Sequence, residues 1–441
     1  MTHNLYSPYG AKSSPPRCAE LCFFSKESDD LLFGEQDEIT LYCRAGLRSV
    51  AMQWTLARNF FTTPFQCGVA EATPNNTYII RIPTAGLHPG FYDLRVSLDT
   101  GEDEVIAGVS TFGYRADAMP ILDTRPADFV AFWDTAKATL AQTPPDARET
   151  FMRSYAGKEI DAYNRAHAAL PGDYDPTGHR SEEVEAYKVD FQSVNGLRIH
   201  GWLAKPKGPG PFPTMLVLPG AGFAARPIPL EHARHGYLAL DLQVHGQEVD
   251  LAEYPRLPGY YDEIVYAPVT EHYYYQVHLN CIQAVNYLTS RSDVDPARIV
   301  VAGGSQGGRL SVVMAGLDSR IAAAIPAIAH FANIPYLDWA EASNAQGVAG
   351  MDIVGTPAQA DTPKNRCIPY YDIMNFAPDV RCPVLMNAGF IDPCSLMSGV
   401  YATYLRLASA DKTLIPLPGM AHDWSAEFDR RAWRWLDERL G

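Results

Sequence analysis

From residue 187 to the C-terminus, short and almost wholly apolar runs alternate with stretches of helical periodicity. The apolar runs cover residues 215–218, 237–242, 299–302, 322–325, 383–386 and 413–417. Helices are expected near residues 273–290, 307–317, 396–409 and 427–440. Because strands that are apolar on both faces occur in parallel sheets covered by helices, this alternation predicts a doubly wound α/β domain with a mostly parallel sheet.

A β-hairpin is expected at the start of this domain. Residues 187–194 and 197–204 are rich in strand-forming residues, and Asn195-Gly196 separates the two runs. Asn-Gly readily adopts the two positive φ angles of a tight hairpin turn. The two runs are therefore predicted to pair as antiparallel strands.

The first part of the chain has a different sequence pattern. Between about residues 20 and 115, short alternating segments are separated by turn residues, which predicts an all-β, immunoglobulin-like sandwich. A helix is expected to open near Pro126, since proline suits a first helical turn, and residues 146–185 are mixed and loop-like. We therefore predict an N-terminal β-sandwich at 1–118, a connecting helical segment at 119–185 and the α/β domain at 186–441.

The charge and the cysteine content of the chain indicate which binding partners and which cellular compartment to expect. The chain has 36 basic and 51 acidic residues, a formal net charge of −15, so neither nucleic acid nor an anionic membrane is an expected partner. We expect no signal peptide and no membrane span, because no apolar run reaches about 18 residues. The eight cysteines include no Cys-x-x-Cys pair, which favours a cytoplasmic protein with reduced thiols. A Cys43–Cys67 disulfide is the minor alternative.

The most specific motif is Gly-Gly-Ser-Gln-Gly-Gly at residues 303–308. It follows the apolar run 299–302 and precedes a helical stretch. A nucleophile on a strand-to-helix turn needs glycines on both sides, because the backbone is strained and neighbouring elements approach closely. The helix would also direct its positive end toward a developing oxyanion. We therefore predict Ser305 as a serine nucleophile; an ordinary glycine-rich turn is the alternative.

A general base and an acid are expected to follow Ser305 in the chain, since this type of fold orders its triad as Ser, acid, His. His422 is the histidine that follows the last predicted strand, which makes it the candidate base. Asp392 follows the run 383–386 at the strand edge where sites of open α/β sheets gather, and it is the candidate acid. Asp392 could instead cap the next helix, and Asp338 is the reserve candidate.

Two backbone N–H groups are expected to form the oxyanion hole. One belongs to Gln306, the residue after the nucleophile, and the other to the loop Pro219-Gly-Ala-Gly222, for which we choose Ala221. Because both donors are backbone groups, the side chain of Gln306 is expected to contribute little.

These residues resemble the acetyl xylan esterase and cephalosporin C deacetylase family of α/β-hydrolases, over about residues 123–441. The resemblance rests on the segments that begin at Pro126, Gly201, Tyr273 and Asp295, and on Asp392 and His422. It implies an α/β-hydrolase fold and hydrolysis of small acyl esters, chiefly acetyl groups on sugars, without a cofactor or metal. The resemblance leaves open whether identical chains form an oligomer.

The chain departs from this family's pattern at three places. It has His245-Gly-Gln where the family has Arg-Gly-Gln, Gly220-Ala221 where Gly-Tyr is common, and His422-Asp423 where the family closes with His-Glu. The leading β-sandwich is a further addition, and no triad or oxyanion residue lies in it. The first two departures affect the expected acyl and alcohol specificity and leave the chemistry intact.

Three functions are therefore compatible with the sequence. The first is a serine carboxylic ester hydrolase that removes acetyl or other small acyl groups from acetylated carbohydrates, or from a similar small acetyl ester, through an acyl-enzyme on Ser305. The second is an acyl-CoA thioesterase or acyltransferase, because some of those enzymes also carry an N-terminal β-sandwich. The third is a non-catalytic binding protein on a hydrolase scaffold.

Overall fold

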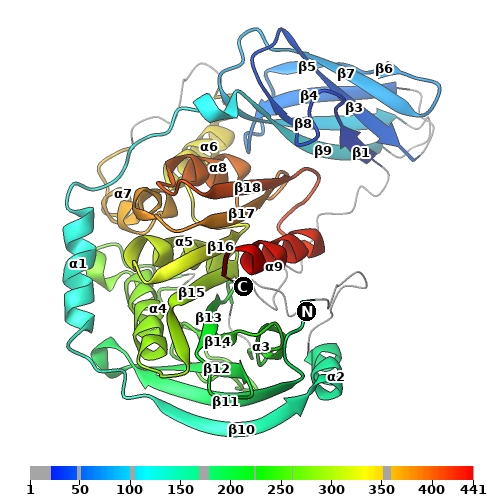
Figure 1. The fold of residues 1–441 in the computed structure, drawn as a ribbon. Coiled ribbons are helices and arrows are strands. Elements are labelled where there is room, and N and C mark those ends of the chain that lie inside the picture. The colour runs from blue at the N-terminus through cyan, green and yellow to red at the C-terminus, as the bar shows by residue number, and fades with distance from the viewer. Residues whose placement is uncertain are drawn as a thin grey trace.

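A computed structural model of the chain describes residues 21–46, 51–99, 105–167, 178–222, 225–260, 262–350 and 359–440. Figure 1 shows a β-rich N-terminal part beside a larger part in which helices surround a long sheet. The fold predicted from the sequence, a β-sandwich followed by an α/β-hydrolase domain, is confirmed.

The N-terminal part contains two sheets. One has the order β1-β3-β7-β6 and the other the order β2-β9-β8-β4-β5. Their bounds are β1 (Leu21–Phe24), β2 (Leu32–Phe33), β3 (Glu38–Ala45), β4 (Ala51–Arg58), β5 (Gln66–Val69), β6 (Glu71–Ala72), β7 (Thr77–Pro83), β8 (Gly90–Asp99) and β9 (Val105–Tyr114). Leu41 of the first sheet and Leu94 of the second are fully buried in one hydrophobic cluster, as alternating inward-facing residues of a sandwich should be. Cys67 carries a free thiol, so the alternative of a Cys43–Cys67 disulfide is wrong.

The larger part is built on a nine-stranded sheet with the order β10-β11-β12-β14-β13-β15-β16-β17-β18. Its strands are β10 (Arg148–Ala156), β11 (Glu183–Gln192), β12 (Arg198–Pro206), β13 (Phe212–Leu218), β14 (Leu238–Gln243), β15 (Val294–Gly304), β16 (Ile321–Ala327), β17 (Val384–Gly389) and β18 (Lys412–Leu417). The pairs from β10 to β14 are antiparallel, and those from β14 onward are parallel. All six predicted apolar runs are strands of this sheet.

Helices cover both faces of the sheet. They are α1 (Phe129–Leu140), α2 (Gly157–His167), α3 (Leu230–Arg234), α4 (Tyr273–Thr289), α5 (Gln306–Leu317), α6 (Ile334–Gln346), α7 (Pro363–Cys367), α8 (Met397–Arg406) and α9 (Ala426–Leu440). Short 3₁₀ turns lie at η1 (Ala116–Ala118), η2 (Val194–Gly196), η3 (Val269–Glu271), η4 (Ile368–Tyr370), η5 (Ile373–Asn375) and η6 (Ala377–Asp379). Along β13, Leu216 lies in the cluster that includes α4 and α5, whereas Met215 lies in the cluster that includes α9. Successive residues of the strand thus contact helices on opposite faces.

The predicted hairpin is present as β11 and β12. Asn195 and Gly196 have φ angles of 59° and 71°, the left-handed values that a tight hairpin turn requires. Gln192 pairs with Arg198 at the first position beyond the turn.

The edge strand β10 is the main feature of the fold that the sequence did not indicate. Its residues fall within the segment that we expected to be a helical connection, yet β10 pairs with β11 along its length. Almost all its side chains are exposed, including Phe151 and Met152, so the strand shows no apolar alternation. The nine-stranded sheet therefore begins before residue 186. The predicted division of the chain into three parts stays a prediction.

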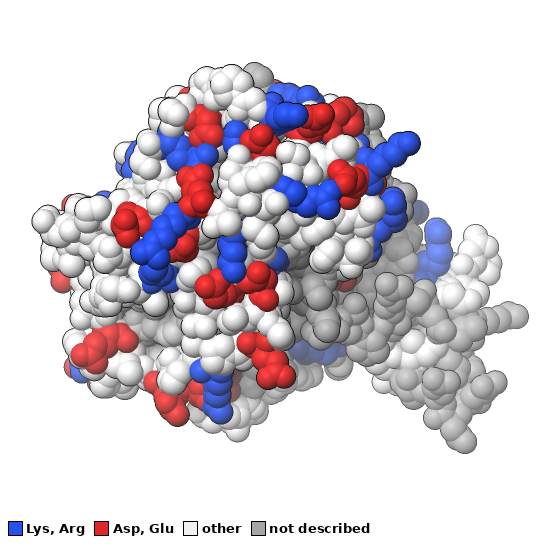
Figure 2. All heavy atoms as spheres, turned by 90° about the horizontal axis from the view of Figure 1, so that it is seen from below, with Lys and Arg blue, Asp and Glu red and all other residues white. Residues whose placement is uncertain are grey.

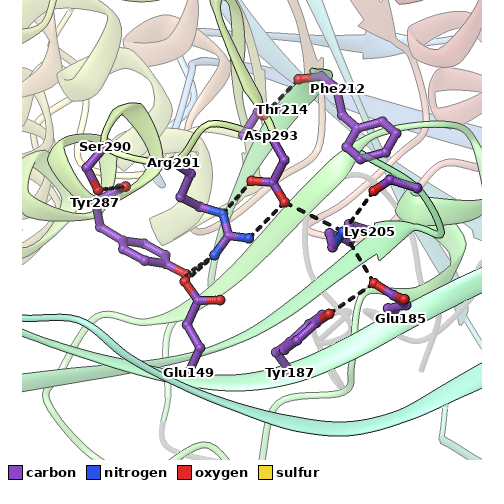
Figure 3. A network of polar contacts seen from close by, with 11 residues as sticks. Glu149, Glu185, Tyr187, Lys205, Phe212, Thr214, Tyr287, Ser290, Arg291 and Asp293 are labelled. Atoms are coloured by element: carbon purple, nitrogen blue, oxygen red, sulfur yellow. Dashed lines mark hydrogen bonds and ion pairs between the residues drawn. The ribbon is translucent and has the colours of Figure 1, made fainter. Parts of the chain in front are cut away.

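Polar contacts attach β10 and its neighbours to the helical layer (Figure 3). Glu149 of β10 accepts a hydrogen bond of 2.8 Å from the Tyr287 hydroxyl and forms an ion pair with Arg291. Arg291 also forms a bidentate ion pair with Asp293, in which Nε and Nη2 each lie 2.9 Å from a carboxylate oxygen. Asp293 in turn lies 3.6 Å from the Lys205 ammonium group. This network attaches an edge strand that buries little of its apolar surface.

On the face seen in Figure 2, basic and acidic side chains lie next to one another. The net negative charge of the chain is therefore not concentrated in one patch on that face. Within the described ranges, no helix combines the length and the apolar character that a membrane span requires.

Candidate active site

Ser305 lies between the end of β15 and the start of α5. Its φ and ψ angles are 57° and −116°, a strained conformation for a residue with a side chain. The flanking glycines permit this tight turn: a Cβ atom on Gly307 would lie 2.2 Å from the carbonyl oxygen of Leu218, and one on Gly303 would lie 2.6 Å from the same atom. The predicted strand–turn–helix geometry of Ser305 is present.

The structure brings His422 and Asp392 to Ser305. His422 Nε2 lies 2.9 Å from Ser305 Oγ, and His422 Nδ1 lies 2.7 Å from Asp392 Oδ2. Because a carboxylate only accepts hydrogen bonds, Nδ1 carries the proton and Nε2 is left to accept from the serine hydroxyl. Both His422 and Asp392 are buried. This chain of hydrogen bonds has the geometry of a Ser–His–Asp triad.

Asp392 also organises the loop that carries it. Its Oδ1 accepts hydrogen bonds of 2.8 Å from the backbone N–H groups of Cys394 and Ser395. The hydroxyl of Ser395 donates to the carbonyl of Ile328, at the end of the neighbouring strand β16. One oxygen of Asp392 therefore caps a local turn while the other contacts His422. The reserve candidate, Asp338, lies on α6 and contacts Lys364 and Gln359 instead.

The two predicted oxyanion residues lie on segments that contact each other, since the Gln306 side chain contacts Pro219 and Gly220. Gln306 is the first residue of α5 and is buried, and Ala221 is exposed in the loop after β13. Gly222, beside Ala221, donates its N–H to the Tyr260 hydroxyl at 3.2 Å. The N–H of Gly222 is thus engaged by a side chain, and the choice of Ala221 as the second oxyanion donor stays a prediction.

The side chain of Gln306 does more than the sequence suggested. Its Oε1 accepts hydrogen bonds from the hydroxyls of Tyr260, at 2.5 Å, and Tyr274, at 2.8 Å. Its Nε2 lies 3.5 and 3.4 Å from the carbonyl oxygens of Pro219 and Gly220. The expectation that this side chain contributes little is therefore revised, because it links the residue after the nucleophile to the oxyanion loop. Neither Tyr260 nor Tyr274 was a candidate site residue, since no spacing in the sequence relates them to Ser305.

His245, which stands where the family has arginine, is part of the same region. Its Nδ1 lies 2.9 Å from the Tyr273 hydroxyl, and its ring packs 4.7 Å from the ring of Tyr260. Burial lowers the pKa of His245 to about 3, so the imidazole is neutral. A neutral ring thus replaces a permanent charge at this position.

A small pocket adjoins Ser305 on the side of β16. Its lining includes His330, Phe331, Leu337, Cys394 and Leu396. The backbone N–H of His330 donates to the carbonyl of Ser305 at 3.2 Å, so one lining residue is bonded to the backbone of Ser305. Burial lowers the pKa of His330 to about 4, so this wall is uncharged at neutral pH.

Two groups of side chains have donor atoms close enough to share a metal ion. One consists of Asp392, Cys394 and His422 and overlaps the triad. The other consists of His179, Glu231 and His235, in which Glu231 also accepts a hydrogen bond of 2.8 Å from Asn164. The acyl-transfer chemistry of the triad geometry requires neither.

Comparison with known proteins identifies relatives of this chain. The acetyl xylan esterase (AXE1) family model matches residues 161–439. Acetyl esterase Axe7A of Xylanibacter ruminicola is 28% identical over 366 residues, which cover 80% of this chain and 75% of the relative.

Solved structures agree with these matches. Acetyl xylan esterase from Paenibacillus sp. R4 superposes with a TM-score of 0.55 at 26% identity, over 74% of this chain and 98% of that one. Acetyl xylan esterase 1 from Thermoanaerobacterium sp. JW/SL YS485 has the same fold, with a TM-score of 0.54 at 19% identity and the same two coverages. The chain is a carboxylic ester hydrolase and belongs to the acetyl xylan esterase family.

Proposed function

We propose that the protein removes acetyl groups from acetylated carbohydrates, with Ser305 as the nucleophile, His422 as the general base and Asp392 as the acid that orients it. The observation that carries this proposal is the continuous hydrogen-bond chain from Ser305 Oγ through His422 to Asp392. Membership of the acetyl xylan esterase family supports the choice of an acetyl ester as substrate.

The proposed reaction has two halves. In the first, His422 Nε2 takes the Ser305 proton as Oγ attacks the acetyl carbonyl, and the alcohol then leaves with that proton. In the second, His422 activates a water molecule, which attacks the acetyl-serine ester and releases acetate. Asp392 accepts a hydrogen bond from Nδ1–H throughout, which keeps Nε2 available as a base and stabilises the imidazolium that forms.

Negative charge develops on the carbonyl oxygen in both halves. We assign its stabilisation to the backbone N–H groups of Gln306 and Ala221, together with the positive end of α5, which begins directly after Ser305.

A substrate comparison tests the proposal. Initial rates should be measured on acetylated xylo-oligosaccharides, acetyl-CoA and p-nitrophenyl esters of increasing acyl length, with the Ser305→Ala variant as the control. We expect hydrolysis of the acetylated sugar and of p-nitrophenyl acetate, and a steep loss with longer acyl chains. Faster turnover of acetyl-CoA than of the sugar esters would favour the thioesterase or acyltransferase alternative, and a lack of turnover of every substrate would favour the non-catalytic one.

A further inference from the structure

The N-terminal sandwich contacts the α/β-hydrolase part at the loop that carries Asp392. We call residues 390–398, which run from the end of β17 into the first turn of α8 and include Asp392, the acid loop. Figure 1 shows the sandwich beside α6 and α8. A cluster of apolar side chains seals this contact, and all its members are buried: Ala57, Phe61, Tyr336, Ala340 and Leu396. Leu396 belongs to the acid loop, so a sandwich residue, Phe61, shares a core with it.

A second apolar contact holds the other end of the acid loop. Phe91 of β8 packs edge-on against Phe390, with 6.1 Å between the ring centroids. It also packs against Tyr401 of α8, at 5.2 Å. Phe91 and Phe390 are each 1% exposed. The sandwich thus contacts the residue two positions before Asp392 as well as the residue four positions after it.

A buried polar contact completes the attachment. Asn59 follows β4 in the sandwich and is 5% exposed. Its Oδ1 accepts hydrogen bonds from the hydroxyl of Ser398, at 2.7 Å, and from the backbone N–H of Ser398, at 3.4 Å. Ser398 is the last residue of the acid loop and is 1% exposed.

Asn59 itself is held rigidly by the sandwich. Its Nδ2 donates to Asp93 Oδ1 at 2.8 Å, and Asp93 also accepts from the Phe60 N–H and the Thr111 hydroxyl. The backbone N–H of Asn59 donates to the Phe91 carbonyl at 2.9 Å. Because each partner of Asn59 is buried and bonded, movement of its side chain would leave polar groups unsatisfied, which costs about 1–3 kcal/mol for each group.

We propose that the sandwich holds the acid loop in its active geometry, with Asn59 as a positioning residue that acts through Asp392. Asp392 is bonded to its own loop through the N–H groups of Cys394 and Ser395, so its carboxylate moves with that loop. Sandwich side chains contact both ends of the loop and therefore fix the distance from Asp392 to His422. The inference rests on the proposed role of Asp392 in catalysis.

The first test compares two substitutions at the same interface in the full chain. Asn59→Ala removes the contact with Ser398. Thr62→Ala is the control: the Thr62 hydroxyl donates to Asn344 of α6 at 3.1 Å, outside the acid loop. We expect Asn59→Ala to lower kcat on p-nitrophenyl acetate by about tenfold to a hundredfold, because misplacement of a catalytic group by about 1 Å can cost about a hundredfold. KM should be unchanged, and Thr62→Ala should retain normal kcat. A normal kcat in folded Asn59→Ala would overturn the inference.

Ser398→Ala covers the case in which Asn59→Ala fails to fold. It removes one hydroxyl donor and leaves every partner of Asp93 in place. We expect a loss of kcat of about threefold to tenfold for this milder change. An unchanged kcat in folded Ser398→Ala would then reject the inference.

The deciding experiment is a double-mutant cycle with Asp392→Asn, read as the rate at which a fluorophosphonate labels Ser305. If Asn59 acts through Asp392, Asn59→Ala should slow labelling in the normal background and have no further effect beside Asp392→Asn. An equal loss in both backgrounds would show a structural role alone and reject the inference. If Asp392→Asn by itself leaves labelling unchanged, the proposed role of Asp392 fails instead, so the two failures are distinguishable.

Discussion

The side chain of Gln306 offers a sharp prediction, because it joins the nucleophile turn to the oxyanion loop without contacting the triad. The perturbation is Gln306→Met, which keeps the side-chain volume and the backbone N–H but removes the acceptor for Tyr260 and Tyr274 and the donor toward the loop carbonyls. The loss of two neutral hydrogen bonds should reduce the free energy of unfolding by about 1–3 kcal/mol. The contacts at 3.4 and 3.5 Å are long and add little.

The loss of kcat should be larger than the loss in the free energy of unfolding suggests. Removal of one oxyanion donor costs about 10²–10³ in kcat; a donor that is displaced and not removed should cost part of this, about tenfold to a hundredfold. Because the oxyanion forms only after attack, kcat should fall while KM stays unchanged.

Two tyrosine variants supply the matched comparison. Tyr260→Phe removes the hydroxyl contacts with Gln306 and Gly222, whereas Tyr274→Phe removes the hydroxyl contact of 2.8 Å with Gln306. Steady-state kinetics on p-nitrophenyl acetate, with a thermal melt of each variant, should rank the loss of kcat as Tyr260→Phe above Tyr274→Phe. Full kcat in folded Gln306→Met, or the opposite order for the tyrosines, would refute the role assigned to this side chain.

Three further predictions follow from the site and its buried groups. Ser305→Ala should lower kcat by about 10⁴–10⁶ in a protein with an unchanged circular dichroism spectrum; retention of a tenth of the activity would remove Ser305 from its role. Ala221→Pro should lower kcat by about 10²–10³ if Ala221 donates its N–H, and a small effect in steady-state assays would point to another loop residue. Burial lowers the pKa values of His235, His245 and His272 to about 3, so below the unfolded value of about 6.5 the unfolded chain binds more protons than the native one. The stability contributed by these neutral rings is therefore present above about pH 6.5 and is lost as the pH falls, so the urea midpoint should drop between about pH 7 and pH 5; an equal midpoint at both values would contradict the assigned burial.

Most of the fold and the strand–turn–helix setting of Ser305 could be predicted from the sequence, because both depend on local signals. Apolar strands, the Asn195-Gly196 turn and the glycines around Ser305 leave a pattern that can be read without tertiary structure. His422 and Asp392 were found through the order of elements in the chain. The edge strand β10 was missed because its side chains are exposed, as those of Phe151 and Met152 show, so that no apolar face marks it.

The contacts that support the site could not be read in the same way. Gln306 meets Tyr260 and Tyr274 across 46 and 32 positions of the chain, and Asn59 meets Ser398 across 339. Each of these contacts is a single polar pair whose partners come together only when the sheet and the sandwich pack. No spacing rule predicts such pairs.

The central claim, an acetyl-enzyme on Ser305, can be tested directly by mass spectrometry. The enzyme should be mixed with p-nitrophenyl acetate, quenched in acid during turnover and digested, with Ser305→Ala treated in parallel. The account predicts a peptide that contains Ser305 and carries the added mass of one acetyl group, and no acetylated active-site peptide from the variant. Turnover by the normal enzyme with acetyl on another residue, or by Ser305→Ala at a comparable rate, would contradict it.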